Sequence, residues 1–319
     1  MSTNDFSLNS IFSVTGKVVV ITGGGTGIGK ALAKGFAQNG ARVYITGRRA
    51  DVLHKAAEEL HHATKGGKVV AIEGDVSSKD GCAAIAQSIA KHESKASRVK
   101  SHLKATSADK AQVDVLINCA GVLLPSERVQ QVNDVDQVEK SLWGVDDDHW
   151  RQTFDINVNG TYFMTIASLP LLRKSADPRV INIASALGWA GYETRAFGTI
   201  SYNASKAAVI HMTENLAARL APAKIRVNAL APGLFPTEMT EGKGKEGGGM
   251  PPPLVKSGLR APLGRLGHLA EIVGPTLLLA SNAGGYINGT AILVDGGQFL
   301  SGGIHDGVKL PDEMYTHTL

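Results

Sequence analysis

Residues 17–40 read KVVVITGGGTGIGKALAKGFAQNG, and this stretch sets the pattern for the rest of the chain. A short apolar run is followed at once by glycines, and then by apolar residues at helical spacing that end at Gly40. The glycines at 23, 27 and 29 allow a tight turn, bring backbone N–H groups close to a phosphate, and let the helix start pack against the strand. The stretch predicts a nucleotide-binding strand–loop–helix unit, although its T-G-x3-G-x-G spacing also suits a purely structural turn.

Further apolar runs repeat this pattern, and each except the last is followed by a segment with helical spacing. They cover residues 41–46, 68–73, 113–118, 180–184, 224–230 and 291–295. Strands that alternate with helices predict an α/β fold, with a doubly wound parallel seven-stranded Rossmann sheet in a single domain. Six successive strand ends carry Gly23, Arg48, Asp75, Asn118, Ser185 and Pro232. Because ligands bind at the carboxyl edge of such sheets, this edge is the predicted site.

The organisation along the chain predicts one domain over residues 1–319, with a core of about 12–300. Residues 1–11 form an N-terminal arm and residues 301–319 a C-terminal tail. The glycine- and proline-rich run EGKGKEGGGMPPP at 241–253 indicates a mobile lid over a substrate, or else a linker to a second domain. Residues 78–110 exceed one crossover helix and indicate a basic, solvated helical insertion, with an RNA-binding segment as the alternative.

Composition narrows the partners and the compartment. The formal net charge of +4, from 33 basic and 29 acidic side chains, argues against nucleic acid as a partner. The two cysteines lie far apart in the sequence, which favours a reducing compartment. The sequence shows no signal peptide, and no apolar run approaches the roughly 18 residues of a membrane span. We therefore expect a cytoplasmic protein with no membrane association and no metal site.

A second stretch, INIASALGWAGYETRAFGTISYNASK at 181–206, carries the predicted chemistry. Ser185 stands where a strand ends, and Tyr202 and Lys206 are four positions apart on a predicted helix, so their side chains share one face. Tyrosine has a pKa of about 10, and a neighbouring ammonium can lower it toward neutrality for proton transfer. The alternative is an ordinary surface tyrosine–lysine pair and a serine that only closes a strand.

Three positions after the second and third predicted strands suggest a nicotinamide cofactor, and a fourth suggests a kinked helix. Arg48 and Arg49 stand roughly 20 residues after the glycines, where an NAD site has an acidic residue for the ribose, so they indicate the 2′-phosphate of NADP. An exposed arginine pair at a helix start is the alternative. Asp75 could accept a hydrogen bond from the adenine amino group, or cap the next helix. Asn157 lies with Gly160 inside a long predicted helix and suggests a kink that holds a water, or simple packing.

With these motifs in order, the chain resembles the short-chain dehydrogenase/reductase family over about residues 16–297. The motifs are TGGGTGIG at Thr22, NCAG at Asn118, NVNG at Asn157, Ser185, YNASK at Tyr202 and PG at Pro232. The run NALAPGLFPTEM from Asn228 is most similar to the 3-oxoacyl reductase branch, including its rhamnolipid-pathway members. The resemblance implies an NADPH-dependent reductase that transfers hydride to a ketone, of 3-oxoacyl type or a secondary-metabolite carbonyl, and forms a secondary alcohol.

The resemblance also implies a role for each matching residue. Tyr202 donates the proton, Lys206 lowers the tyrosine pKa and holds the nicotinamide ribose, Ser185 binds the carbonyl oxygen, and Asn157 holds a water that resupplies protons. The implied NADP(H) contacts are Gly23, Gly25, Thr26, Gly27, Ile28, Arg48, Arg49, Asp75, Val76, Asn118, Ala120, Gly121, Tyr202, Lys206, Pro232, Gly233, Phe235 and Thr237.

Two departures from the family pattern stand out. Ser185 and Tyr202 are farther apart than is usual, so a longer loop with Trp189, Tyr192 and Arg195 is expected at the substrate mouth. Cys119 replaces the second asparagine of the usual NNAG.

Other functions within this fold stay open. They are a non-catalytic NADP-sensing module, a dehydrogenase of polyols or steroids, and an enoyl-thioester reductase. Family members commonly pair across two-fold axes, through the helix that begins at Tyr202 and the strand 291–295. We therefore expect a homotetramer or a homodimer, with a small carbonyl or alcohol compound as substrate.

Overall fold

The computed structural model describes residues 5–64, 68–101, 111–124, 134–189, 200–240, 255, 258–259 and 261–302. Within them, seven parallel strands form one sheet in the order β3-β2-β1-β4-β5-β6-β7. The predicted α/β doubly wound sheet is confirmed, and every predicted strand overlaps an observed one. The strands are β1 (Val18–Thr22), β2 (Arg42–Gly47), β3 (Lys68–Glu73), β4 (Val115–Asn118), β5 (Arg179–Ile183), β6 (Arg226–Pro232) and β7 (Ala291–Val294).

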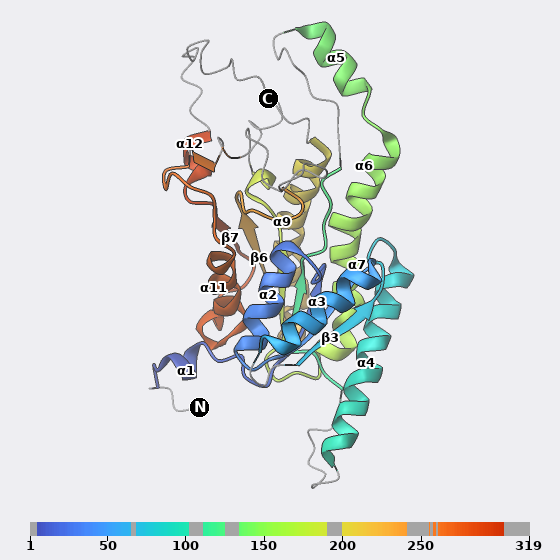
Figure 1. Ribbon diagram of the computed structural model, residues 1–319, viewed down its shortest axis with the longest axis vertical. Helices are drawn as coiled ribbons and strands as arrows, with labels where there is room; N and C mark the ends of the chain where they lie inside the picture. The colour runs from blue at the N-terminus through green and yellow to red at the C-terminus, as the bar shows by residue number, and fades with distance from the viewer. Residues whose placement is uncertain are drawn as a thin grey trace.

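Helices cover both faces of the sheet (Figure 1). The alternation of side chains along β1 decides which residue meets which layer, because Val19 and Ile21 pack in one core cluster and Val18 and Val20 in the other. The first cluster holds side chains of α2 (Gly27–Gln38), α3 (Ala50–His62) and α11 (Leu269–Ala280). The second holds side chains of α4 (Lys79–Ser101), α7 (Gly160–Leu172) and α9 (Ile200–Leu220).

The strand order reverses at β1, which pairs with β2 on one side and with β4 on the other. Loops that leave β1 and β4 therefore depart toward opposite faces of the sheet, and a crevice opens between them at the carboxyl edge. Gly40, the predicted end of the first helix, has φ +81°, a conformation in which an L side chain would be strained. The glycine thus turns the chain from α2 back into β2.

The predicted helix over 149–172 is interrupted. It consists of α6 (Asp147–Phe154), a π-helical turn η1 (Asp155–Asn159), and α7, so the irregularity expected at Asn157 takes the form of one widened turn. The other short elements are α1 (Leu8–Ile11), α5 (Val135–Trp143), η2 (Ala186–Gly188), η3 (Ala221–Ala223), η4 (Asn282–Gly284) and α12 (Gln298–Gly302).

A polar cluster lies at the amino edge of the sheet. The buried Arg179 donates to the Ala280 carbonyl at 2.5 Å and pairs with Asp177, which also pairs with Arg226. Burial lowers the pKa of the Arg179 guanidinium to about 10. This cluster ties β5 and β6 to the end of α11, far from the crevice at the opposite edge.

Some predicted segments lie outside the described residues. They are residues 102–110 of the basic insertion, the whole of the lid at 241–253, the tail from residue 303 onward, and Tyr192 and Arg195. Within the described ranges, no helix has both the length and the apolar character needed to cross a membrane.

Candidate active site

The crevice at the carboxyl edge is a cleft of about 300 Å³. Most of the predicted site residues line this cleft: Gly23, Gly25, Thr26, Gly27, Ile28, Arg48, Arg49, Asp75, Val76, Ala120, Gly121, Ser185, Tyr202, Lys206, Pro232, Gly233, Phe235 and Thr237. Asn118 and Asn157 are the two predicted residues that do not line it.

The glycine loop forms the floor of the cleft. Thr26 is the N-cap residue of α2 and has extended backbone, but its side chain forms no capping hydrogen bond. The first N–H groups of the helix therefore have no side-chain partner from Thr26. A Cβ on Gly23 would lie 2.9 Å from the Ala120 Cα, which shows how closely the loops after β1 and β4 approach each other. The arrangement offers backbone donors and the positive end of a helix to an anion.

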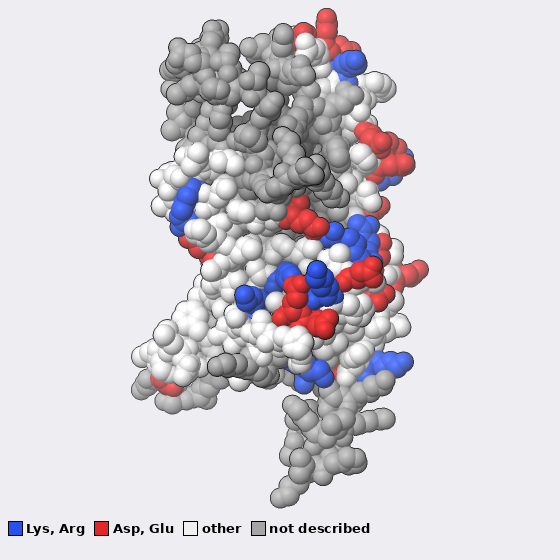
Figure 2. Space-filling model, in the orientation of Figure 1, with Lys and Arg blue, Asp and Glu red and all other residues white. Residues whose placement is uncertain are grey.

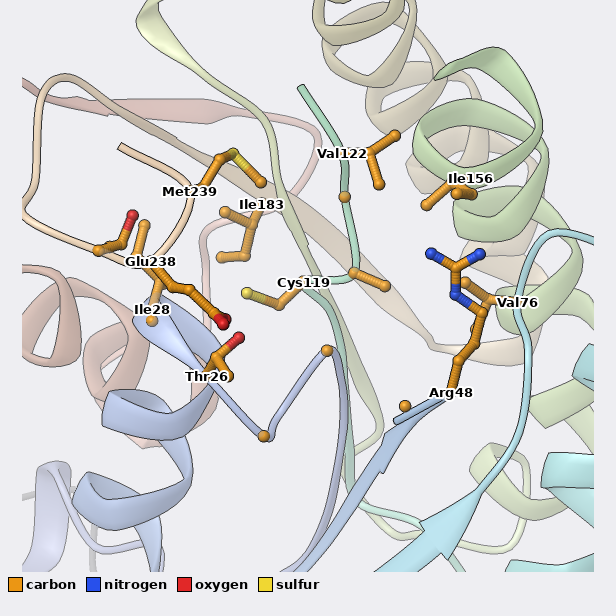
Figure 3. Close-up of a pocket in the computed structure, with 18 of the residues that line it drawn as sticks. Thr26, Ile28, Arg48, Val76, Cys119, Val122, Ile156, Ile183, Glu238 and Met239 are labelled. Carbon is orange, nitrogen blue, oxygen red and sulfur yellow. The ribbon is translucent and has the colours of Figure 1, made fainter. Parts of the chain in front are cut away.

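Thr22 holds the loop after β4 against the glycine loop. Its Oγ1 accepts hydrogen bonds from the N–H groups of Cys119 and Ala120, both at 3.0 Å. The Cys119 side chain is thereby placed in the cleft (Figure 3). Burial raises the pKa of its thiol to about 12, so it is an uncharged thiol at neutral pH.

The side chain of Asn118 points away from the cleft, contrary to the expected cofactor contact. It is 3% exposed, and its Nδ2 donates to Thr165 Oγ1 at 3.0 Å and to Asn182 Oδ1 at 2.9 Å. Successive side chains of a strand point to opposite faces, so residue 118 turns toward α7 when residue 119 turns to the cleft. Asn118 therefore cross-links β4, β5 and α7.

The side chains of Ser185, Tyr202 and Lys206 lie close together in the cleft. Ser185 follows β5, and its Oγ accepts from the Leu187 N–H at 3.2 Å. The Ser185 and Tyr202 hydroxyls share a hydrogen bond. Lys206, one turn further along α9, donates from Nζ to the Ile183 carbonyl at 2.9 Å and lies 5.6 Å from the centre of the Tyr202 ring.

Burial dominates the ionisation of this group. It raises the pKa of Tyr202 to about 12, and the hydrogen bond from Ser185 only partly offsets the rise. Burial also lowers the pKa of Lys206 to about 8. In this structure the loss of hydration is the largest influence on the Tyr202 pKa, and the lowering by Lys206 stays a prediction. At neutral pH, Tyr202 is a protonated phenol and Lys206 an ammonium.

Asn157 positions the site from behind it. The residue is 1% exposed, its Oδ1 accepts from the Val122 N–H at 2.9 Å, and its Nδ2 donates to the Val122 carbonyl at 3.1 Å and to Ser205 Oγ at 3.0 Å. Ser205 Oγ in turn donates to the Tyr202 carbonyl at 2.7 Å. The amide thus ties the loop after β4 to the first turn of α9, where the sequence suggested a bound water.

Asn157 is nevertheless close to the reacting groups. A Cβ built on Gly121 would lie 3.3 Å from Asn157 Oδ1 and 3.4 Å from Lys206 Nζ. The amide and the ammonium therefore both face the point where a side chain of residue 121 would begin, and a side chain there would press against both.

The two arginines after β2 differ in their surroundings. Arg49 donates from Nη1 and Nη2 to the two carboxylate oxygens of Glu238, at 2.9 and 2.8 Å. Arg48 points to the other side of the cleft, toward Val76 and Ile156 (Figure 3). Asp75 accepts from the Ser77 N–H at 2.9 Å, while the Ser78 hydroxyl accepts from Gly81 at the start of α4. Capping of α4 therefore falls to Ser78 rather than to Asp75.

Several residues of the cleft were not predicted from the sequence. Apolar side chains of Val122, Ile156, Ile183 and Met239 line it, together with the carboxylate of Glu238. Each of the first three lies within a few positions of a predicted site residue, which is the signal that could have identified them. Glu238 directly follows Thr237, but no local pattern indicates its partner, 189 positions away.

Charges on the surface are mixed. On the face that carries α2 and α3, acidic and basic side chains lie beside one another, as in the Lys30–Glu59 pair at 2.5 Å (Figure 2). In the described part of the chain, no group of three or more histidine, cysteine or acidic side chains is arranged to hold a metal ion.

Comparisons with known proteins agree with this geometry. The family model described as short chain dehydrogenase matches residues 17–247. The short-chain dehydrogenase/reductase PhomF of Diaporthe leptostromiformis is 36% identical over 294 residues, covering 90% of this chain and 93% of that protein. The rhamnolipids biosynthesis 3-oxoacyl-(acyl-carrier-protein) reductase of Pseudomonas aeruginosa is 30% identical over 299 residues, covering 91% and 99%.

A solved structure shares the fold. It is the NADP complex of RhlG from Pseudomonas aeruginosa, with a TM-score of 0.72 and 29% identity over 91% of this chain and 98% of that one. The parallel sheet, the glycine loop at its switch point and the Ser185–Tyr202–Lys206 group are thus joined by similarity along nearly the whole chain. The chain belongs to the short-chain dehydrogenase/reductase family, whose members are oxidoreductases that act on carbonyl and alcohol groups with a nicotinamide cofactor.

Proposed function

We propose that this protein is an NADPH-dependent reductase that transfers hydride to a ketone and releases a secondary alcohol. One observation carries the proposal: the hydroxyls of Ser185 and Tyr202 are hydrogen-bonded to each other, and the buried Lys206 ammonium lies 5.6 Å from the centre of the Tyr202 ring. The group lines the same cleft as the glycine loop. A proton donor and an anion-binding loop in one cleft suit a reaction that adds hydride and a proton to a carbonyl group.

The residues present fit a dinucleotide. The start of α2 lacks a side-chain cap and turns its N–H groups to the cleft, which suits a pyrophosphate. The close contacts of Gly23 and Gly29 with neighbouring backbone leave no room for side chains at this loop. Lys206 and the loop at 119–121 would hold the nicotinamide end, and Asp75 and Val76 the adenine end. When bound, NADPH supplies the hydride for the carbonyl carbon.

NADP rather than NAD is proposed because Arg48 stands at the end of β2. An arginine there can form charge-assisted hydrogen bonds to a 2′-phosphate, worth about 1.5–3 kcal/mol. The position has no acidic side chain of the kind that binds an NAD ribose. The related structure with NADP supports the same assignment.

Each side chain of the site has its own role in the proposed reaction. Ser185 Oγ would hold the carbonyl oxygen in place, and Tyr202 would give its proton to that oxygen as charge develops on it. Lys206 is held by the Ile183 carbonyl and would return a proton toward the tyrosine. Asn157 and Ser205 fix the first turn of α9, so that Tyr202 and Lys206 keep their positions.

The ionisation state of Tyr202 suits the proposed role of a proton donor. With a pKa near 12, Tyr202 keeps its proton throughout the physiological range and can act as an acid. Oxidation of an alcohol needs the opposite state, a phenolate base. Tyr202 is thus in the protonation state that ketone reduction requires.

The ketone is proposed to be of 3-oxoacyl type or a secondary-metabolite carbonyl. The name of the Pseudomonas relative, a 3-oxoacyl reductase, supports the first choice. We also propose one domain over residues 1–319 and a cytoplasmic homotetramer or homodimer. In support of the assembly, β7 ends the sheet, and Ala204, Ala207 and Ala208 on α9 keep accessible surface, which permits close approach of a second helix.

The test is a direct assay of NADPH oxidation by the purified protein. A panel of ketones, including 3-oxoacyl thioesters, is offered with NADPH or NADH. We expect turnover of at least one ketone and a preference for NADPH of about tenfold or more, which Arg48→Ala removes. Cofactor binding without turnover of any ketone would favour a sensing module, and equal use of NADH would refute the cofactor assignment.

A further inference from the structure

Glu238 and Arg49 join two walls of the cleft. Arg49 caps α3 directly after β2, and Glu238 lies in the loop after β6, 189 positions away. Both carboxylate oxygens accept from the guanidinium, at 2.9 and 2.8 Å, which is the bidentate geometry that gives arginine pairs their directionality. Figure 3 shows Glu238 and Arg48 on opposite sides of the cleft.

The loop that carries Glu238 is a compact turn. Thr240 Oγ1 accepts from the Thr237 N–H at 2.9 Å and lies 2.9 Å from the Phe235 carbonyl, to which it donates. The turn also touches the glycine loop, because a Cβ on Gly27 would lie 3.3 Å from the Thr237 Cβ. The ion pair therefore holds this turn to the start of α3, and the second contact holds it to the glycine loop.

Arg48 has different surroundings from Arg49. Its guanidinium lies near Val76 and Ile156, on the side of the cleft proposed for adenine (Figure 3). Within the described ranges, Arg48 forms no hydrogen bond or ion pair, and its cationic head is available to an incoming anion. Two consecutive arginines thus offer one uncommitted cation and one cation already committed to a carboxylate.

We propose that Arg48 alone recognises the 2′-phosphate, whereas Arg49 and Glu238 form a clasp that holds the loop after β6 over the bound cofactor and slows its release. The inference rests on the proposed NADPH-dependent function. A guanidinium that is bidentate to a carboxylate cannot also be bidentate to a phosphate, and a phosphate beside Glu238 would meet like charge. The clasp therefore acts on both NADPH and NADH, and selectivity belongs to Arg48.

The expected size of the effect is modest. The side chains of Arg49 and Glu238 are 56% and 48% exposed, so water and salt weaken their attraction. Exposed ion pairs typically change an equilibrium by no more than about fivefold. Loss of the clasp should raise the rate of cofactor dissociation about two- to fivefold, and high salt should bring the wild type toward the same rate.

The experiment measures the release of NADPH and NADH by stopped-flow fluorescence. The variants are Glu238→Gln, Arg49→Ala, Arg48→Ala, and the exchange of charges in Arg49→Glu with Glu238→Arg. Glu238→Gln and Arg49→Ala should release both cofactors about two- to fivefold faster and keep the NADPH preference. The exchange should restore slow release. Arg48→Ala should weaken NADPH binding about tenfold or more and leave NADH binding nearly unchanged.

The possible outcomes separate the hypotheses. If Arg49→Ala loses the NADPH preference as Arg48→Ala does, or if Glu238→Gln releases both cofactors at the wild-type rate, the clasp is refuted while the proposed reductase stands. If the wild type binds neither cofactor, the proposed function fails and the clasp fails with it. Unchanged thermal unfolding of each variant confirms that these exposed positions leave the fold intact.

Discussion

Removing one oxygen atom from Tyr202 tests the proposed chemistry. In the Tyr202→Phe variant the ring stays beside Lys206, whose Nζ keeps its hydrogen bond to the Ile183 carbonyl. The lost contact is the hydrogen bond with Ser185. Fold and cofactor binding should therefore survive, while the proton donor is gone.

The structure allows the two effects to be sized separately. One hydrogen bond at a half-buried hydroxyl contributes about 0.5–1.5 kcal/mol to the free energy of unfolding. A domain with roughly 5–15 kcal/mol of stability stays almost fully folded after that loss. General acid catalysis contributes about 10²- to 10⁴-fold, which corresponds to about 3–5 kcal/mol of transition-state stabilisation. Loss of activity should thus far exceed any loss of folded protein.

The assay follows NADPH oxidation with the best ketone of the panel, together with thermal unfolding and NADPH binding. Because the proton moves only in the transition state, kcat should fall while KM changes little. Tyr162→Phe, at a 41% exposed tyrosine of α7, serves as the control and should keep full activity. A Tyr202→Phe enzyme that keeps more than about a tenth of the wild-type kcat would show that another group supplies the proton.

Three further predictions concern the surroundings of the site. The pKa of Lys206 is lowered to about 8, so Lys206 binds fewer protons in the folded chain than in the unfolded chain between that pH and its ordinary value near 10.5, and its contribution to the free energy of unfolding should rise with pH across this window; the measurement is the difference in urea unfolding between wild type and Lys206→Met, and a difference that stays constant with pH would refute the assignment. Asn157→Ala should cost about 1–3 kcal/mol in urea unfolding, because the half-buried N–H and carbonyl of Val122 lose their partner; the exposed Asn159→Ala, two positions along the same turn, is the control and should cost less than about 0.5 kcal/mol. Gly29→Ala should lower the melting temperature by several degrees, since its Cβ would lie 2.3 Å from a backbone oxygen of the glycine loop; Gly274→Ala in α11, with nothing within 4 Å, should not.

Local patterns were sufficient for the fold and for most of the site. The short apolar run KVVVIT and its repeats identified the seven strands of the described sheet. The reason is that a parallel strand buried on both faces is a continuous apolar run. Residues after those strands came together in the cleft, because parallel strands present all their carboxyl ends at one edge. The four-residue spacing of Tyr202 and Lys206 placed them on one helix face beside Ser185.

The side-chain partners could not be predicted in the same way. Asn118 stands in the same motif as Ala120 and Gly121, yet it bonds to Thr165 and Asn182 inside the sheet. That outcome depends on which face of β4 position 118 occupies, and α7 covers that face only in the folded chain. The sequence suggested that Asn157 holds a water at a helix kink. In the structure its side-chain amide forms hydrogen bonds with the N–H and the carbonyl of Val122.

By itself, the sequence determined the order of elements, the seven-stranded sheet and the grouping of Ser185, Tyr202 and Lys206, because these depend on periodicity and on spacing over a few residues. The tertiary structure decided the ionisation of Tyr202 and Lys206, since burial by distant segments sets both pKa values. It also decided the partner of Arg49, which comes from 189 positions along the chain. Desolvation and long-range ion pairing depend on which surfaces meet in space, and no local pattern records that.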